Sequence, residues 1–223
     1  MSRQVTVVDY GVGNLFSVQR ALESCGVSDV LVSARAEDIA RADRLILPGV
    51  GAFRDGMRGL RDRNLVEPIV DYARSGRPLL GICLGMQMLA RESEEFGRHE
   101  GLDLIPGQVR AIPRLDADGK RLKVPFIGWT PITLASPSAA AGSCLAGLGA
   151  GDAVYLVHSF HFVPDDPAHM LATYRFGAGD VTAAVRRDNI TGFQFHPEKS
   201  GKVGLDILRT FVATDTAAAA AWR

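Results

Sequence analysis

The chain has 223 residues, of which 47% are hydrophobic and 22% are charged, an ordinary composition for a soluble globular protein. Its 25 basic and 25 acidic residues give a formal net charge of zero, so the sequence lacks the basic excess that non-specific nucleic-acid binding requires. We expect a single domain over residues 1–223, because no linker-like segment interrupts the pattern.

The cysteines and the apolar runs indicate a cytoplasmic protein. Cys25, Cys83 and Cys144 are odd in number and form no C-x-x-C pair, which fits a reducing compartment and argues against a structural zinc site. No secretory signal or membrane partner is expected, because four residues precede the first apolar run and no apolar stretch approaches about 18 residues. The segment 11–13 lacks the third glycine of a dinucleotide fingerprint. We therefore expect no cofactor and no metal.

The first half of the chain alternates apolar runs with segments of helical periodicity. Asn14 is a typical helix-capping residue, and Leu15, Val18, Leu22 and Cys25 follow it at helical spacing. Helical segments are also expected within 53–75, and strands in the ranges 5–11, 29–33, 44–49 and 78–82. Apolar strands without alternation, separated by helices, indicate an α/β fold with an open, mostly parallel central sheet flanked by helices.

From about residue 102 the pattern changes to a succession of short strand-like pieces, up to "ITGFQF" at 190–195. This half is expected to add antiparallel strands, followed by a closing helix over about 202–212. Residues 136–151, which are rich in Ala, Gly and Ser, predict a loop or short insertion. The alanine-rich stretch 216–222 is expected to be a frayed tail.

The segment 79–87, "LLGICLGMQ", leads an apolar strand into a Gly-x-Cys-x-Gly turn and then into helix formers. A sharp turn between strand and helix needs residues without bulk, here Gly81 and Gly85, and it projects the central side chain into a cleft. Cys83 would lie at the N-terminus of the following helix, where unpaired N–H groups favour the thiolate. The alternative is a buried core cysteine, which we assign to Cys25.

A nucleophilic thiol needs a base, and "FQFHPEK" singles out His196. It ends an apolar strand that Pro197 stops, and Glu198 lies two residues further on. If the backbone stays extended, the two side chains point to the same side, so the carboxylate can orient the imidazole. The other histidines have simpler interpretations. His158, His161 and His169 are expected to be satisfied structural residues, and His99 is expected to lie in a solvated loop.

Acyl transfer also needs donors for a developing oxyanion. In an elbow of this kind the backbone N–H of Leu84, directly after the nucleophile, is one such donor. A second must come from another loop, and "LILPGVGAF" at 45–53 ends a strand in a glycine-rich turn whose backbone can approach a ligand. The alternative for this segment is an ordinary tight turn.

Taken together, these segments resemble the class I, or triad-type, glutamine amidotransferases, and among them the glutaminase subunits of imidazole glycerol phosphate synthase. The resemblance spans nearly the whole chain through "DYGVGNL", "LPGVGAF", "GICLGMQ", "VPFIGW", "YLVHSFHF" and "GFQFHPEKSG". It implies that Cys83 attacks the glutamine amide and that a glutamyl thioester forms. It also implies contacts to substrate from Gly51, Gln87, Glu95, Ser159 and Phe160. For Glu95 the alternative is a solvated acidic helix end.

The resemblance further implies a partner, a cyclase subunit with a (β/α)8 barrel that receives ammonia within a heterodimer. This cyclase would form imidazole glycerol phosphate and an aminoimidazole carboxamide ribotide in histidine biosynthesis. Trp129 and Lys199 match the interface positions of the family, with core packing as the alternative for Trp129. The sequence departs from the pattern at "VPFIGWT", where relatives more often resemble "VPHMGWN", so that Phe126 and Thr130 replace His and Asn.

Three other functions remain open from the sequence. The chain could serve a different ammonia-using synthase, which would be recognised by the synthase that activates it. It could be a thiol hydrolase or peptidase that acts alone, with turnover independent of any partner. It could also be a non-catalytic subunit, in which a glutamine-like electrophile would not alkylate Cys83.

Overall fold

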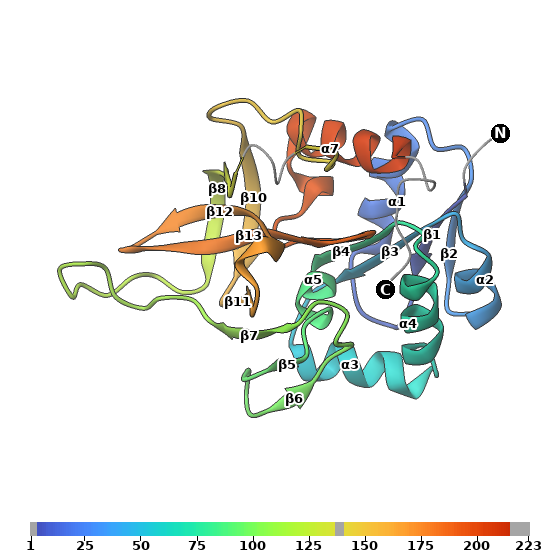
Figure 1. The fold of residues 1–223 in the computed structure, drawn as a ribbon, viewed down its shortest axis with the longest axis horizontal. Helices are drawn as coiled ribbons and strands as arrows, with labels where there is room; N and C mark the ends of the chain where they lie inside the picture. The colour runs from blue at the N-terminus through green and yellow to red at the C-terminus, as the bar shows by residue number, and fades with distance from the viewer. Residues whose placement is uncertain (1–3, 137–140, 215–223) are drawn as a thin grey trace.

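The computed structural model describes residues 4–136 and 141–214, and its central feature is a long mixed sheet (Figure 1). The strand order is β2-β1-β3-β4-β14-β13-β12-β9. Pairing is parallel from β2 to β14 and antiparallel from β14 to β9. The predicted fold class is therefore confirmed. The strands are β1 (Val5–Val8), β2 (Val30–Ser33), β3 (Arg44–Gly49), β4 (Leu79–Cys83), β9 (Thr133–Leu134), β12 (Met170–Phe176), β13 (Gly179–Arg187) and β14 (Ile190–Phe193).

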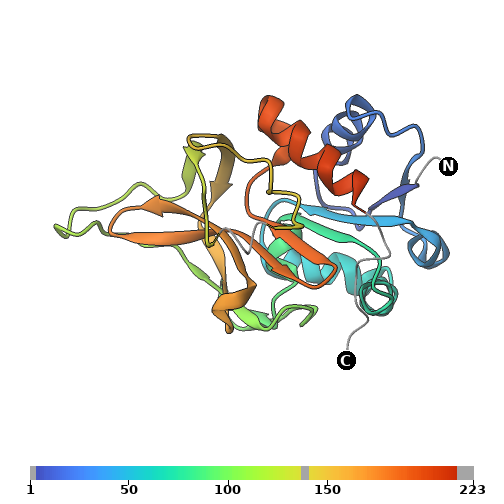
Figure 2. The same ribbon diagram turned by 45° about the horizontal axis from the view of Figure 1, so that its top comes forward.

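Helices cover both faces of the parallel strands (Figure 2). On one face, α1 (Leu15–Ser24) and α7 (Gly201–Ala213) pack over strand residues such as Val7 and Ile46. On the other, α2 (Ala36–Arg41), α3 (Phe53–Asp62) and α4 (Val66–Arg74) pack over residues such as Val8 and Leu47. Because both faces are buried, these strands are apolar at consecutive positions. Among these helices, only the short α2 was not predicted from the sequence.

In the described chain, no helix combines the length and apolarity needed to cross a bilayer.

Helix α1 begins as predicted, since the Asn14 side chain accepts a hydrogen bond from the Ser17 N–H at 3.3 Å. The expectation for Cys25 is wrong in its details. It lies one residue beyond the end of the helix, is only partly buried, and donates its thiol to the Leu205 carbonyl at 3.4 Å. Cys25 therefore joins α1 to α7 and packs against the core.

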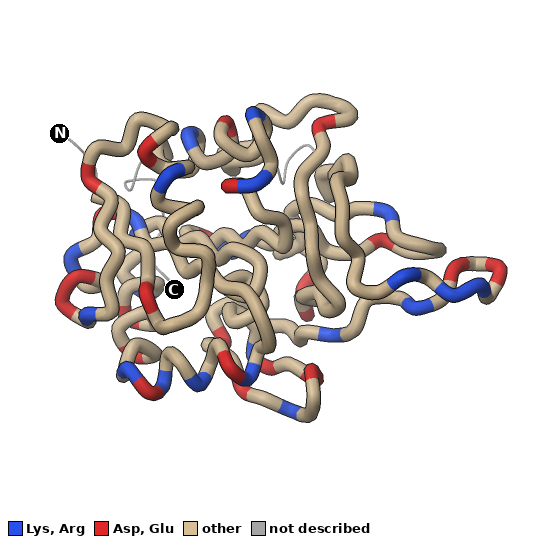
Figure 3. Tube along the Cα trace, turned by 180° about the vertical axis from the view of Figure 1, so that it is seen from behind, with Lys and Arg blue, Asp and Glu red and all other residues tan. Residues whose placement is uncertain are grey.

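The remaining strands form two smaller sheets beside the β12–β13 hairpin, in the orders β11-β7-β5-β6 and β10-β8 (Figure 1). The connection between β7 and β8 protrudes and carries charges of both signs (Figure 3). These strands are β5 (Glu92–Ser93), β6 (His99–Glu100), β7 (Gly107–Ala111), β8 (Phe126–Pro131), β10 (Ala153–His158) and β11 (Phe160–Pro164). Of the predicted loop at 136–151, residues 137–140 lie outside the described residues. Residues 141–151 form turns, as expected, although Cys144 and Leu145 are buried in the core. The predicted tail at 216–222 lies outside the described residues.

The turn from β4 into α5 (Leu84–Met88) depends on two glycines that have no room for a side chain. A Cβ on Gly85 would lie 1.7 Å from the carbonyl oxygen of Leu47 in β3, and one on Gly81 would lie 2.8 Å from the backbone of Gly85. Cys83, between them, has a φ of +54°, a strained conformation for a residue with a side chain. The first turn of α5 is thereby pressed against the sheet. The helix has five residues.

Replacement of Gly85 by Ala is expected to lower the free energy of unfolding by about 3 kcal/mol, because the Leu47 carbonyl is backbone and cannot turn aside. Urea unfolding of Gly85→Ala beside Gly147→Ala measures this, since a Cβ on Gly147 meets nothing within 4 Å. Equal stabilities for the two variants would contradict the proposed backbone contact.

Candidate active site

The carboxyl ends of β3, β4 and β14 meet at one edge of the sheet, because Gly49 pairs with Cys83 and Ile82 pairs with Phe193. A cavity of about 270 Å³ opens at this edge. Eight residues selected from the sequence line it, namely Gly51, Cys83, Leu84, Gln87, Glu95, Ser159, Phe160 and His196. Val50, Pro125, Val157 and His158 also line it, and the sequence analysis did not assign them to the site.

Cys83 and His196 line this cavity, and Glu198 pairs with His196. His196 and Glu198 have side chains only 2% exposed, and the imidazole Nδ1 lies 2.8 Å from the Glu198 Oε1. The expected reason for this pairing is wrong, because the backbone does not stay extended. A 3-10 turn, η2 (Pro197–Lys199), starts directly after His196 and brings the carboxylate back to the Nδ1 edge of the ring.

The surroundings of His196 favour its protonated form. Burial by itself lowers the pKa of an imidazole, but interactions with Cys83 and Glu198 outweigh it and raise the pKa of His196 to about 10. Its Nε2 is buried and has no hydrogen-bond partner among the described residues. The ring therefore offers a proton at Nε2 on the side of the cavity, while Nδ1 is held by the carboxylate.

Strand β10 fixes the His196 segment through its backbone. The N–H of His196 donates to the Tyr155 carbonyl at 2.9 Å. The Ser200 hydroxyl accepts from the Tyr155 N–H at 3.0 Å and donates to the His196 carbonyl at 2.7 Å. Ser200 entered the sequence analysis only as part of a motif, and its role as a clamp depends on a strand more than 40 positions away.

Two buried glutamines also belong to the surroundings of the thiol. Gln87 donates from Nε2 to the Phe160 carbonyl at 2.9 Å and to the Gln194 Oε1 at 3.0 Å. Gln194, which is fully buried, donates from Nε2 to the Cys83 sulfur at 3.7 Å. The sequence analysis missed Gln194, although a polar residue inside the apolar "GFQF" run was a usable signal.

The remaining histidines do not compete as the base. His158 is held between a backbone carbonyl and the Tyr174 hydroxyl, both at 2.8 Å, and burial lowers its pKa to about 4. Burial likewise lowers the pKa of His161 to about 4. Two expectations are wrong: His99 is partly buried in β6, and His169 is partly buried with Nδ1 unpaired among the described residues.

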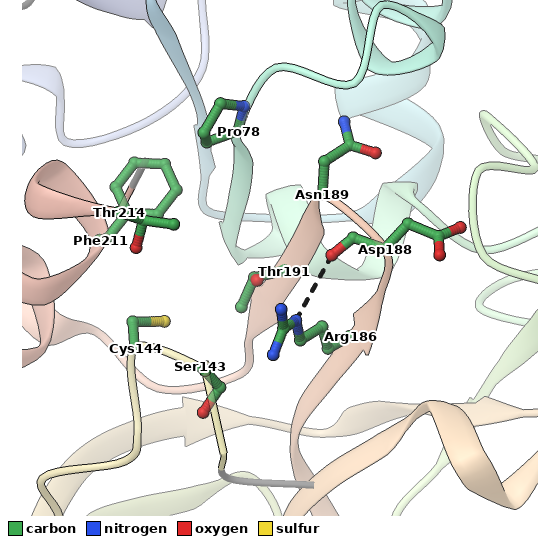
Figure 4. Close-up of a pocket in the computed structure, with 10 residues that line it drawn as sticks. Pro78, Ser143, Cys144, Arg186, Asp188, Asn189, Thr191, Phe211 and Thr214 are labelled. Atoms are coloured by element: carbon green, nitrogen blue, oxygen red, sulfur yellow. Dashed lines mark hydrogen bonds between the residues drawn. The ribbon is translucent and has the colours of Figure 1, made fainter. Parts of the chain in front are cut away.

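The other thiols lie outside the cavity. Burial raises the pKa of Cys144 to about 12 and also raises the pKa of Cys25. Cys144 lines a separate cavity of about 80 Å³ between the 141–151 segment, the end of α7 and the β13–β14 turn (Figure 4). That cavity contains none of the site residues selected from the sequence, and the Arg186 on its wall donates to the Asp188 carbonyl at 3.4 Å. Cys83 is thus the cysteine that combines a cavity with a base.

Glu95 follows β5, and its Oε2 accepts from the Phe53 N–H at 2.7 Å, at the start of α3. A solvated helix end is therefore the wrong description of Glu95.

Trp129 is 56% exposed on β8, beside Ile127 at 57%, so the core-packing alternative for Trp129 is also wrong. Lys199 is exposed.

Phe126, one of the departures from the family pattern, packs edge-on against Phe176 at 5.4 Å between ring centres and tilts over Tyr174 at 5.1 Å. It fills an aromatic cluster under β8. Thr130 is half-buried on the same strand.

Within the described chain, no group of three or more His, Cys, Asp or Glu side chains could hold a metal ion.

Comparisons with known proteins agree with this geometry. The model of the family "Glutamine amidotransferase class-I" matches residues 6–214. The solved structure of a putative GMP synthase component from Thermoplasma acidophilum has the same fold, with a TM-score of 0.67, 21% identity, and coverage of 96% of this chain and 94% of that one. The chain is therefore a class I glutamine amidotransferase.

Two curated relatives narrow the assignment. The "Imidazole glycerol phosphate synthase subunit HisH 1" of Legionella pneumophila (strain Paris) is 50% identical over 211 residues, or 93% of this chain and 98% of the relative. The HisH subunit of Syntrophotalea carbinolica is 48% identical over 212 residues, with the same two coverages. Within its class, the chain belongs to the HisH family.

The His196–Glu198 pair predicts a dependence of stability on pH. The pKa of His196 is raised from 6.5 to about 10 in the folded chain. The protonated ring therefore adds to the free energy of unfolding in full below pH 6.5, and this stabilisation is lost as the pH rises towards 10. Urea unfolding from pH 6 to 10 should show a steeper fall for the parent than for Glu198→Gln. Parallel curves would contradict a charged pair.

Proposed function

We propose that this chain is the glutaminase subunit of an imidazole glycerol phosphate synthase, which hydrolyses glutamine to glutamate and ammonia for histidine biosynthesis. The observation that carries the proposal is that Cys83 and His196 line one cavity and that Glu198 holds the His196 ring through Nδ1. The names of the HisH relatives support the choice of synthase. We further propose that residues 1–223 act as one domain.

In the first half of the reaction, the Cys83 thiolate attacks the side-chain amide carbon of glutamine. The resulting tetrahedral intermediate collapses as the carbon–nitrogen bond breaks, and the proton on His196 Nε2 passes to the leaving nitrogen. Ammonia departs and a glutamyl thioester remains on Cys83. The raised pKa of His196 supports this role, because the ring holds the required proton at neutral pH.

In the second half, water adds to the thioester carbonyl and gives a proton to the now neutral His196. The carbon–sulfur bond breaks, glutamate leaves, and the thiolate and imidazolium are restored. Glu198 holds the ring through Nδ1 in both halves and balances its charge.

The oxyanion of each tetrahedral intermediate needs hydrogen-bond donors, for which we propose the backbone N–H groups of Leu84 and Gly51. Leu84 follows the nucleophile directly, and both residues line the cavity. Gly51 has a φ of +98°, and a Cβ there would meet nothing within 4 Å, so its backbone borders open space.

The amino-acid end of glutamine fits the acceptors on the cavity wall. Both donors of Gln87 are already given to protein groups, so the oxygen it can still offer suits the α-ammonium group. The Glu95 carboxylate supplies the matching negative charge. Ser159 and Phe160 also line the cavity and complete the proposed substrate contacts.

The partner in this proposal is a cyclase subunit with a (β/α)8 barrel, joined to this chain as a heterodimer. It uses ammonia to form imidazole glycerol phosphate and an aminoimidazole carboxamide ribotide. Trp129 and Ile127 form an exposed apolar pair on β8, and Lys199 lies on the nearby η2 turn. The Trp129 ring lies 6.1 Å from that of Tyr155, which lies 6.5 Å from His196. This aromatic row joins the proposed interface to the site.

The decisive test is glutamate release from glutamine by the chain alone and with the cyclase subunit loaded with its ribonucleotide. We expect release to rise many-fold with the loaded cyclase and to vanish in Cys83→Ala, while Cys144→Ala retains it. Equal release with and without the cyclase would favour an autonomous hydrolase. Undiminished release by Cys83→Ala would refute the assigned nucleophile.

Truncation of Trp129 tests the interface. Because a buried aromatic anchor is typically worth about 2 kcal/mol, Trp129→Ala should weaken binding of the cyclase about 30-fold. Titration calorimetry measures the Kd, with Phe96→Ala as the control, since Phe96 is 77% exposed in the turn between β5 and β6. An unchanged Kd for Trp129→Ala would place the interface elsewhere.

A further inference from the structure

A continuous series of buried hydrogen bonds ends on the Cys83 sulfur. It begins at the backbone carbonyl of Phe160, which accepts from His158 Nδ1 at 2.8 Å and from Gln87 Nε2 at 2.9 Å. The same Gln87 nitrogen donates to the Gln194 Oε1 at 3.0 Å, and the Gln194 Nε2 donates to the sulfur at 3.7 Å. The series therefore connects β11, α5 and the end of β14 to the nucleophile.

The direction of every bond in the series follows from its first member. A backbone carbonyl can only accept, so Gln87 must turn its nitrogen, and not its oxygen, towards Phe160. The second proton on that nitrogen points at Gln194, so the Gln194 side chain must accept it with its oxygen. In this buried site a flipped Gln87 amide would set two acceptors against each other, and a flipped Gln194 amide would set its NH2 group against that of Gln87.

We propose that Gln194 is a positioning residue that aims an amide N–H at the Cys83 sulfur and holds it as a thiolate, in an orientation set by Gln87 and the Phe160 carbonyl. This inference rests on the proposed role of Cys83 as the nucleophile. A thiolate accepts hydrogen bonds and donates none, so a fixed donor favours it over the thiol.

Burial makes this donor important. Cys83 is 7% exposed and Gln194 is fully buried, so water has little access to replace a lost hydrogen bond to the sulfur. His196 provides the compensating charge, whereas Gln194 provides a neutral donor that keeps its proton throughout the reaction. The amide can therefore hold the sulfur in place while the histidine proton moves to the leaving nitrogen.

The test measures the thiolate directly. The rate at which iodoacetamide alkylates Cys83 is followed against pH in the full chain, by mass spectrometry of the peptide that contains it. Gln194→Met removes the donor at nearly constant side-chain volume, and the midpoint of the profile should move up by about one pH unit. The matched control is Gln108→Met, because Gln108 also donates to a side chain, Glu92 at 2.8 Å, but lies outside the cavity. It should leave the midpoint unchanged.

Kinetics with the loaded cyclase supply a second readout. The value of kcat for glutamate release should fall about tenfold in Gln194→Met with little change in KM, because the residue contacts the sulfur and not the substrate. The pH at which kcat reaches its plateau should rise in parallel with the alkylation midpoint. A change confined to KM would contradict the assigned role.

Gln87→Met provides an independent test, which also covers the case that Gln194→Met does not fold. Gln87 has no hydrogen bond to the sulfur, but its replacement removes the group that orients Gln194. The alkylation midpoint should therefore rise, as in Gln194→Met. Midpoints equal to that of the parent in Gln194→Met, or in Gln87→Met, would overturn the inference. Failure of the proposed function is distinguishable, since it would abolish the response of glutamate release to the cyclase and leave the alkylation shifts intact.

Discussion

The site depends on one backbone contact, the approach of Gly85 to the carbonyl of Leu47, where a single added carbon would lie 1.7 Å from the oxygen. This contact lets α5 begin directly against the sheet. It also forces the chain to reverse at Cys83, which adopts a φ of +54° that the surrounding packing maintains. The thiol thereby projects from the end of β4, and the residues that serve it all take their positions relative to that point.

Two sets of side chains serve the thiol. The His196–Glu198 pair lies on a 3-10 turn that β10 fixes through Ser200, and it supplies a proton and a charge. Gln194, directly after β14, supplies a neutral hydrogen bond, and Gln87 in α5 holds Gln194. Because the strands β3, β4 and β14 are adjacent and parallel, these groups share one edge of the sheet.

The sequence predicted the site best where a reactive side chain and the residues that shape the backbone around it lie within a few positions of each other. The glycines around Cys83 reveal both a sharp turn and a projected thiol, and "HPE" places an acid beside a base. Reasoning failed for residues whose surroundings come from distant segments. Cys25 looks typical of a helix stripe, yet it lies past the end of α1 and donates to Leu205 of α7. His99 looks typical of a solvated loop, yet it is partly buried in β6.

The sequence by itself determined the alternation of apolar strands and helices, the elbow and the motifs that mark the family, since these features depend on propensity and spacing. Only the tertiary structure decided that Gln194 meets Cys83, 111 positions away, and that Ser200 clamps the His196 turn. It also decided that Trp129 is exposed and not buried. The physical reason is that such contacts form only after particular strands have paired, and pairing partners are not encoded in the local pattern.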